Sequence, residues 1–259
     1  PVTVPLASRF VRSVVLSKQV QECDYLVNLP KLKTHSLTTY TGAIKNTFGH
    51  LCGSDKVRMH RLAPNAGDFA ELLLDLYALR APDLNIMDAI VGLEGNGPNN
   101  GTPRPAGLLA ASPHALALDL VMAEWIGLPL SRVPHLALGL RRGIGPASRE
   151  EVRIEGPLPP IAPFRRPSQP LRGPLSWLVR HLGFPSLLRT KLRVTPELCT
   201  GCEACRRHCP VTAIAMRDKL PVFDHARCVE CFCCMELCPQ QAIVFPTGLL
   251  KFITGRRNR

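Results

Sequence analysis

Nine of the eleven cysteines in this 259-residue chain lie between Cys199 and Cys238. They form two runs, "CTGCEACRRHCP" and "CVECFCCMELCP", which share the spacing C-x2-C-x2-C-x3-C-P at a constant offset of 29 residues. The positions that keep this spacing are Cys199, Cys202, Cys205, Cys209, Cys228, Cys231, Cys234 and Cys238. Cysteines concentrated in this way indicate a metal-binding module rather than the disulfide framework of a secreted domain.

The spacing of the thiols favours a cluster of iron and sulfide. Thiolate sulfur is a soft ligand that suits iron, and a tight loop with three thiolates can wrap one side of a cube. Four-cysteine zinc sites are the alternative, but they pair C-x2-C motifs across a longer loop and do not use triplets closed by C-P. The repeat also continues past the ligands, because Pro210 aligns with Pro239 and Ile214 with Ile243.

The two runs resemble those of bacterial-type two-cluster ferredoxins. This resemblance implies two 4Fe-4S clusters, each with a fourth ligand from the other half of the module. It assigns one cluster to Cys199, Cys202, Cys205 and Cys238, and the other to Cys228, Cys231, Cys234 and Cys209. Cys233 falls outside the register that Cys234 keeps, so we interpret it as a small buried side chain, with an alternate ligand as the other interpretation. The isolated Cys23 and Cys52 are expected to be packing residues.

A second group of residues that could do chemistry lies in "LPKLKTHSLTTYTGAIKNTFGH", residues 29 to 50. If a strand ends at Leu32, then Lys33 and His35 leave the sheet at its carboxyl edge, where open α/β sheets bind ligands. A turn at Thr41 and Gly42, followed by a helix, would direct free backbone N–H groups into the same crevice. The glycine-rich "GLEGNGPNNGTPR" also follows a strand-like segment and offers further backbone N–H groups.

These features predict a wall that binds a small anion such as a carboxylate or a phosphate. Its predicted members are Lys31, Lys33, His35, Lys45, Asn46, Glu94, Gly95 and Gly97. Lys45 and His35 are the candidates for catalysis, because a buried lysine or a histidine can transfer a proton near neutral pH. Two alternatives stay open, namely a metal bound by Asp88 and Glu94, and an ordinary strand end and turn.

The elements that must position these residues alternate between strand-like and helix-like patterns. "CDYLVNLPKL", "DLNIMDAIVG" and "GLLAAS" are predicted strands, and "DFAELLLDLYALRAP" is a predicted helix with one apolar face. That face consists of Phe69, Leu72, Leu73, Leu76 and Leu79. A further helix is predicted to begin with Ser112 as its cap and Pro113 in its first turn. The fold class is therefore an α/β N-terminal domain with a mostly parallel sheet, followed by a small α+β ferredoxin-like domain.

Four segments upstream of the cysteines resemble the family catalogued as domain of unknown function 362. They are "LPKLKTH", "TGAIKNTFG", "DAIVGLEGNGPNNGTPR" and "ALDLVMAEWIGL", in that order. The resemblance covers roughly residues 10 to 155. Members of this family often carry ferredoxin modules and are described only as iron–sulfur proteins of unknown activity. The resemblance therefore implies a fold and an iron–sulfur role, and it implies no particular reaction.

Composition predicts four segments. These are an α/β domain at 1–156, a proline-rich basic linker at 157–190, a two-cluster ferredoxin domain at 191–247 and a basic tail at 248–259. The linker prediction depends on eight prolines between Pro157 and Pro185, which exclude a continuous helix or central strand there. From Gly156 to Pro196 the chain contains no acidic residue. The linker and tail therefore hold much of the positive charge.

The formal net charge of +12 favours an acidic partner. We expect a redox partner protein of acidic character, with peripheral contact to an anionic membrane surface as a second candidate. Nucleic acid is disfavoured, because no recognisable nucleic-acid module accompanies the charge. No run of eighteen apolar residues predicts a membrane span, and no signal pattern precedes the domain. We therefore expect a cytoplasmic protein, and an opening residue of Pro1 is consistent with a fragment.

Two classes of function agree with these features. In the first, the protein is an oxidoreductase or a reductase subunit, in which electrons enter the clusters and reduce a ligand bound in the α/β domain. In the second, it is a non-catalytic electron carrier or a maturation factor, whose α/β domain docks a partner protein. A ligand bound in the α/β domain would separate the two classes.

Overall fold

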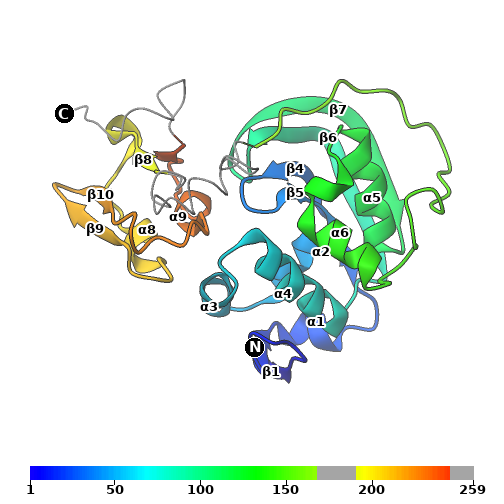
Figure 1. The fold of residues 1–259 in the computed structure, drawn as a ribbon, viewed down its shortest axis with the longest axis horizontal. Helices are drawn as coiled ribbons and strands as arrows, with labels where there is room; N and C mark the ends of the chain where they lie inside the picture. Colours follow the sequence, from blue (N-terminus) through cyan, green and yellow to red (C-terminus); the bar gives the residue numbers. More distant parts are fainter. Residues whose placement is uncertain (168–190, 246–259) are drawn as a thin grey trace, which may run out of the picture. The chain divides into compact units, whose positions relative to one another are not determined.

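The structure is a computed structural model that describes residues 1–167 and 191–245, and the chain divides into two compact units after Pro167 (Figure 1). Unit 1 is Pro1–Pro167 and unit 2 is Ser168–Arg259. Most of the predicted linker, from 168 to 190, and the predicted basic tail lie outside the described residues. Within the described ranges, no helix is both long enough and apolar enough to cross a bilayer.

The central sheet of unit 1 is mixed. Its strands are β3 (Val27–Asn28), β4 (Lys31–His35), β5 (Thr39–Thr41), β6 (Leu84–Asn96) and β7 (Asn100–Ser112). Strands β3 and β4 both run parallel to β6, whereas β5 is antiparallel to β4 and β7 is antiparallel to β6. The parallel pairs agree with the prediction, and the two antiparallel pairs show that a mostly parallel sheet is only partly confirmed.

Strands β6 and β7 form one long hairpin that the sequence did not predict. Their register runs from Asn85 opposite Ser112 to Asn96 opposite Asn100. The glycine-rich segment predicted as a loop therefore lies largely inside the two strands, and "GLLAAS" belongs to β7 rather than to a separate parallel strand. Among the described strands β7 pairs only with β6, and an edge strand of this kind tolerates prolines such as Pro103 and Pro105.

Helices lie on one side of this sheet (Figure 1). They are α1 (Lys18–Glu22), α2 (Ala43–Asn46), α3 (Asp55–Leu62), α4 (Ala66–Leu79), α5 (Ala115–Trp125) and α6 (Pro134–Arg141), with 3-10 turns η1 (Thr47–His50) and η2 (Leu130–Arg132). The predicted face of α4 is buried at Phe69, Leu72, Leu73 and Leu76. Helix α5 begins two residues later than predicted, because Ser112 accepts a hydrogen bond from the His114 N–H (3.1 Å) and the cap is His114.

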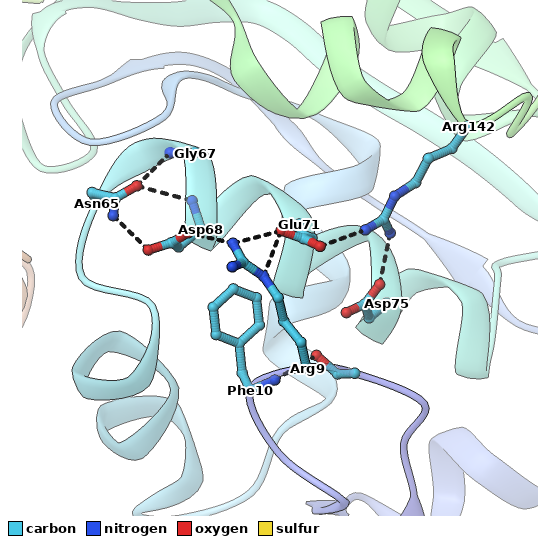
Figure 2. A network of polar contacts seen from close by, with 9 residues as sticks. Arg9, Phe10, Asn65, Gly67, Asp68, Glu71, Asp75 and Arg142 are labelled. Carbon is cyan, nitrogen blue, oxygen red and sulfur yellow. Dashed lines mark hydrogen bonds and ion pairs between the residues drawn. The ribbon is translucent and has the colours of Figure 1, made fainter.

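A network of ion pairs joins the N-terminal hairpin and α6 to α4 (Figure 2). This hairpin consists of β1 (Val2–Pro5) and β2 (Ser13–Leu16). Arg9, in its loop, contacts Asp68 (2.6 Å) and Glu71 (2.8 Å) on α4. Arg142 contacts the same Glu71 (3.4 Å) and Asp75 (2.6 Å). Single exposed pairs add little stability, but arginines that share a carboxylate fix the elements relative to one another.

The first part of the predicted linker packs on unit 1, and we call residues 157–167 the strap. Phe164 is 3% exposed and its N–H donates to the Ile126 carbonyl (2.9 Å). Its ring lies so close to Gly92 that a Cβ there would be 2.8 Å from it. Arg165 donates to the Glu94 carboxylate from its backbone N–H (3.0 Å) and its Nε (2.7 Å). Unit 1 therefore continues to Pro167.

Unit 2 is small and repeats itself. Its elements are β8 (Arg193–Val194), η4 (Pro196–Leu198), α8 (Ala204–Arg207), β9 (Ile214–Arg217), β10 (Leu220–Phe223), α9 (Cys233–Glu236) and β11 (Ile243–Val244). Strand β8 pairs with β11, and β9 with β10. Left-handed residues recur at the 29-residue offset, with φ of 60° at Glu203 and 61° at Phe232, and 51° at Thr212 and 50° at Gln241. The sequence repeat is therefore also a repeat of backbone conformation.

Candidate iron–sulfur and ligand sites

The three cysteines of each triplet lie in a loop that ends in a short helix. In the first half the loop turns at Gly201, and in the second at Glu230, both with positive φ (70° and 56°). The turn at Glu230 directs its backbone N–H to the Sγ of Cys228 (3.4 Å). These left-handed positions bend the chain so that it surrounds a small volume instead of continuing as a strand.

Cysteines of both halves meet around one hollow. Its lining includes Cys199, Cys202 and Cys205 from the first triplet together with Cys238 from the second run. Apolar side chains complete the wall, among them Met216, Pro221 and Ile243. The structure thus brings together the four thiols that the ferredoxin resemblance assigned to one cluster.

The other four thiols are related by their electrostatics. Burial, together with the charges of Cys231, Glu230 and Cys209, raises the pKa of the Cys228 thiol, against hydrogen bonding from the Glu230 N–H. The pKa of Cys234 is also raised, mainly by burial and then by the charges of neighbouring cysteines that include Cys209. Cys209, from the first run, therefore lies in electrostatic range of the second triplet.

Backbone N–H groups stabilise the sulfur of the last cysteine in each run. Ala213 donates to the Sγ of Cys209 (3.2 Å), and Ala242 donates to the Sγ of Cys238 (3.3 Å). These two contacts are again 29 residues apart. Hydrogen bonds to the ligand sulfurs are one of the ways in which a protein adjusts the properties of a bound cluster.

The arrangement of the donors fits a cluster better than a single ion. In residues 1–167 and 191–245, no three side chains of His, Cys, Asp or Glu converge closely enough to hold one metal ion. A cube of four irons and four sulfides needs thiolates that are spaced more widely around it. The donor set is also entirely thiolate, as expected for 4Fe-4S ligation.

Cys233 is buried at 5% exposure beside the second triplet. Its thiol donates a hydrogen bond to the sulfur of Cys231, which raises the pKa of Cys233 and lowers that of Cys231. Its place in the repeat corresponds to Ala204 in the first half. This position agrees with the interpretation of Cys233 as a buried neighbour of the ligands.

In unit 1, β4 continues to His35 instead of ending at Leu32, so the predicted lysines lie within the strand. Lys31 forms an ion pair with Asp88 of β6 (2.7 Å), and both side chains are more than 40% exposed. Lys33 is half-buried and lies opposite Thr41 of β5. The strand extends because its backbone pairs on one side with β6 and on the other with β5.

Asn46 belongs to a ladder of amides that ties α2 to the sheet. Its amide donates to the Oδ1 of Asn28 (2.7 Å). The Asn28 amide in turn donates to the Ala43 carbonyl (3.0 Å) and to the Oδ1 of Asn85 (2.8 Å). The structure therefore gives Asn46 a role in holding α2 against β3 and β6.

Glu94 is buried at 5% exposure and faces arginines. Besides the two contacts from Arg165, it accepts a hydrogen bond from Arg104 (3.1 Å). Burial raises the pKa of Glu94, but the hydrogen bonds and charges of Arg165 and Arg104 outweigh this effect and hold it below its usual value. The Gly95 N–H donates to the Arg165 carbonyl (2.8 Å), so this part of β6 binds the strap.

The end of β4 lies against the glycine-rich segment. Ser36 donates from its N–H (3.0 Å) and its hydroxyl (2.8 Å) to the Gly97 carbonyl. The hydroxyl of Thr34 donates to the Gly95 carbonyl (2.8 Å). A Cβ at Gly97 would collide with the Thr34 carbonyl, so the close approach requires glycine there.

The first N–H groups of α2 bind a carboxylate of the protein itself. Ala43 and Ile44 donate to Asp119 on α5 (2.6 and 2.9 Å), and the hydroxyl of Tyr40 donates to the same carboxylate (3.2 Å). Asp119 is fully buried, and this burial raises its pKa to about 7. These N–H groups were expected to face a ligand, and Asp119 takes that place. A Cβ at Gly42 would collide with Asp119.

His35 and Lys45 are brought into the neighbourhood of His135, a residue of α6. The ring of His35 is fully buried and its Nδ1 accepts from the Leu37 N–H (3.0 Å). The Nζ of Lys45 lies 5.9 Å from the centre of the Phe48 ring. His135 is also fully buried and stacks on Tyr40 at 6.3 Å. Burial, and then the charges of Lys45 and His35, lower the pKa of His135 to about 3.

Sequence reasoning did not select Tyr40, Asp119 or His135. Asp119 and His135 each lie singly in an apolar stretch, "ALDLVMAEWIGL" and "PHLALGLR", whereas Tyr40 lies among threonines in "LTTYTG". The one available signal for Asp119 was a charge on the buried face of an otherwise apolar helix. No comparable signal distinguished His135 from a packed core histidine.

Comparison with known proteins identifies both parts of the chain. Residues 1–124 match the family model for the domain of unknown function DUF362, and residues 191–239 match the model for a 4Fe-4S dicluster domain. The chain therefore carries a DUF362 domain followed by a 4Fe-4S ferredoxin-like domain, as the sequence motifs predicted.

Three relatives illustrate the two parts. A thylakoid-associated protein of Synechocystis sp. is 43% identical over 136 residues, which are 52% of this chain and 42% of the relative. Ferredoxin-2 of Chlorobaculum tepidum is 40% identical over 58 residues, which are 20% of this chain and 92% of the ferredoxin. One component of an ion-translocating oxidoreductase complex of Methanosarcina acetivorans is 40% identical over 45 residues, 17% of this chain and 17% of that component. The chain spans less than half of the thylakoid-associated relative. The ferredoxin relatives support iron–sulfur electron transfer.

Proposed function

We propose that this protein binds two 4Fe-4S clusters and passes electrons to or from a ligand or partner at its α/β domain. The observation that carries the proposal is the hollow lined by Cys199, Cys202 and Cys205 together with Cys238. Thiols from both halves surround one volume, and the backbone repeat supplies an equivalent set for a second cluster. When bound, such clusters accept and release single electrons.

The chain's own residues would hold the clusters and control their surroundings. Cys238 would complete the first site and Cys209 the second. The N–H groups of Ala213 and Ala242 would stabilise the sulfur of these two ligands. Apolar side chains such as Met216 and Ile243 would form part of the wall of the first site.

Metal analysis tests the number of clusters. We expect the anaerobically purified chain to contain about eight iron and about eight sulfide, because each 4Fe-4S cluster supplies four of each. About two zinc per chain with little iron would contradict the proposal, since that ratio corresponds to two four-cysteine zinc sites.

A pair of double variants tests the exchange of ligands between the halves. If Cys209 and Cys228 bind the same cluster, the variant Cys209→Ala/Cys228→Ala should keep about four iron, because only one cluster is lost. If each run holds its own cluster, the same variant should lose nearly all iron. Cys205→Ala/Cys228→Ala is the matched control, because it removes a ligand from both clusters under either arrangement.

The ligand proposal for the α/β domain depends on His35 and Lys45, which both act on His135. We propose that Lys45 binds a small carboxylate or phosphate, and that Lys45 and His35 are the candidates for proton transfer. Calorimetric titration with inorganic phosphate and with malonate tests this. Lys45→Ala should abolish any heat of binding and leave the iron content unchanged, whereas equal binding by the variant would refute the role of Lys45.

A specific observation supports the non-catalytic alternative. Three predicted members of the wall already have partners in the protein, because Lys31 contacts Asp88, Asn46 contacts Asn28 and Glu94 contacts Arg165. These contacts favour an electron carrier or maturation factor whose α/β domain docks a protein. Turnover of a small substrate with a chemical reductant would support the enzyme. Reduction of another protein without such turnover would support the carrier.

The location and partner remain predictions of the charge pattern. We propose an acidic redox protein as the partner and the cytoplasm as the location. One relative is named as thylakoid-associated, which makes an anionic membrane surface the second candidate. Flotation with lipid vesicles tests the membrane candidate. A cluster-loaded chain that binds an anionic membrane should rise with phosphatidylglycerol vesicles and stay below with neutral phosphatidylcholine vesicles, whereas a chain that binds only a protein partner should stay below with both.

A further inference from the structure

The two cluster sites have the same backbone but different surroundings. The internal repeat allows a comparison of residues at equivalent positions, 29 apart. Cys202, the middle ligand of the first triplet, is exposed, whereas its equivalent Cys231 is only 7% exposed. At this ligand the first site is therefore closer to solvent than the second.

Apolar side chains cover the second site. Phe232 and Met235 are 5% and 3% exposed, and Phe232 packs edge-on against Phe245 with the ring centres 5.1 Å apart. Their equivalents in the first half are Glu203 and Arg206, which form an exposed ion pair (2.6 Å). The second site is thus covered by apolar side chains at positions where the first site carries charged ones.

The nearby charges also differ in sign. Glu236 is the last residue of α9, two residues after Cys234 and two before Cys238, and its side chain is half-buried. The equivalent residue in the first half is the exposed Arg207, which by the repeat holds the same place relative to Cys202. Lys219 places a second cation near the first site. The Lys219 carbonyl accepts a hydrogen bond from the Cys199 thiol (3.9 Å), and a Cβ added at Gly201 would lie 3.0 Å from the Cβ of Lys219.

The differences in exposure and in charge shift the reduction potentials of the two sites in the same sense. Reduction adds a negative charge to a cluster that is already anionic with its four thiolates. Cations and solvent nearby stabilise that charge, whereas a buried apolar surface and carboxylates oppose it. Both effects make the first site easier to reduce than the second.

Building on the proposed function, we infer that the cluster of Cys199, Cys202, Cys205 and Cys238 has the higher reduction potential and exchanges electrons with an acidic protein docked over Cys202. The cluster of Cys228, Cys231, Cys234 and Cys209 has the lower potential and passes its electrons to the first. The docking surface consists of the exposed Arg207 and Lys219 around the exposed Cys202.

A redox titration followed by electron paramagnetic resonance tests the order of the potentials, using the full chain loaded with about eight iron. Two one-electron steps are expected. Arg207→Glu, which copies Glu236, should lower the upper step, and the reciprocal Glu236→Arg should raise the lower one. Arg153→Glu, a change at an exposed side chain of unit 1, is the control and should move neither. Coincident steps, or a variant that moves the other step, would overturn the inference.

Small charged oxidants test the docking surface. The reduced protein gives one electron to the anion Fe(III)–EDTA, which becomes Fe(II)–EDTA, or to the cation tris(phenanthroline)cobalt(III), which becomes the cobalt(II) complex. The anion should react faster at low salt, and the combined change Arg207→Glu/Lys219→Glu should slow the anion and accelerate the cation. Equal effects on both oxidants would overturn the surface. A chain that binds no iron would instead refute the proposed function, so the two failures are distinct.

Discussion

Asp119 shows how one buried carboxylate can take the place expected for a ligand. It accepts two backbone N–H groups of α2 and the hydroxyl of Tyr40. Gly42 must be glycine in this arrangement, because a Cβ would collide with the carboxylate. Asp119 thereby ties α5 to the segment that carries Lys45. Any ligand near Lys45 must then be held by side chains rather than by the start of α2.

Asp119 and His135 should affect stability in opposite directions as pH changes. Burial raises the pKa of Asp119 from 3.8 to about 7, so its contribution is present below pH 3.8 and lost as pH rises through 7. Burial lowers the pKa of His135 from 6.5 to about 3, so its contribution is present above pH 6.5 and lost as pH falls. Between about pH 4 and 6.5 the two effects oppose each other.

Removal of the histidine should reveal the carboxylate. We compare the change in the free energy of unfolding between pH 7 and pH 5. This change should favour pH 5 more in His135→Leu than in the unchanged chain, because the variant loses the opposing contribution of His135 and keeps that of Asp119. Urea unfolding followed by circular dichroism at several pH values measures this. His50→Leu is a useful comparison, because burial and then the charge of Arg80 lower the pKa of His50 to about 4, which gives an effect of the same sign. Parallel pH profiles for His135→Leu and the unchanged chain would contradict the assignment.

At the scale of elements, local pattern and long-range pairing explain what the sequence could and could not predict. The helical period of "DFAELLLDLYALRAP" predicted α4 and most of its buried face, because that signal is local. The β6–β7 hairpin was missed because glycine and proline weaken the strand signal of β7, and only its pairing with β6 makes it a strand. The cysteine ligands were predictable because their spacing is itself the motif. Asp119 and His135 were not, since their roles depend on α2 and β5, which are distant in sequence.

The strap is the element with the most direct test. Phe164 is buried between α5 and β6, and its loss should leave a cavity and release the segment from unit 1. We expect Phe164→Ala to lower the free energy of unfolding by about 3 kcal/mol, as is typical for a buried phenylalanine. Trypsin should then cleave faster after Arg165. Ile154→Ala is the control, because Ile154 is 42% exposed and its loss should change neither stability nor cleavage. Equal cleavage of the two variants would mean that Phe164 does not hold the strap.

The contacts of the strap also affect which basic residues can attract an acidic partner. The buried Glu94 offsets one of the two positive charges of Arg165 and Arg104, so these three residues together add one positive charge to the field that an approaching partner experiences. Most of the steering charge is therefore expected from the other basic residues of the acid-free run, such as Arg166 and Arg172, and from unit 2. Substituting Arg165 would mix a loss of charge with a loss of strap contacts.

Association with an acidic redox protein should therefore weaken steeply with salt, because exposed charges are screened over about 8 Å at physiological ionic strength. We expect Arg166→Gln/Arg172→Gln to slow association with a small acidic flavodoxin at low salt and to lose this effect at about 0.5 M salt, since steering acts on the association rate. Stopped-flow mixing of the cluster-loaded chain with the flavodoxin measures the rate constant. Arg12→Gln/Arg153→Gln is the matched control, because it also removes two exposed charges but lies on unit 1 outside the acid-free run. A linker variant that associates as fast as the unchanged chain at low salt would exclude Arg166 and Arg172 from steering. Rates that do not depend on salt would count against steering by any of the exposed basic residues, Arg207 and Lys219 included. If instead the linker variant and Arg207→Glu slow association by factors that multiply, the two basic regions act on the same partner as independent parts of one field.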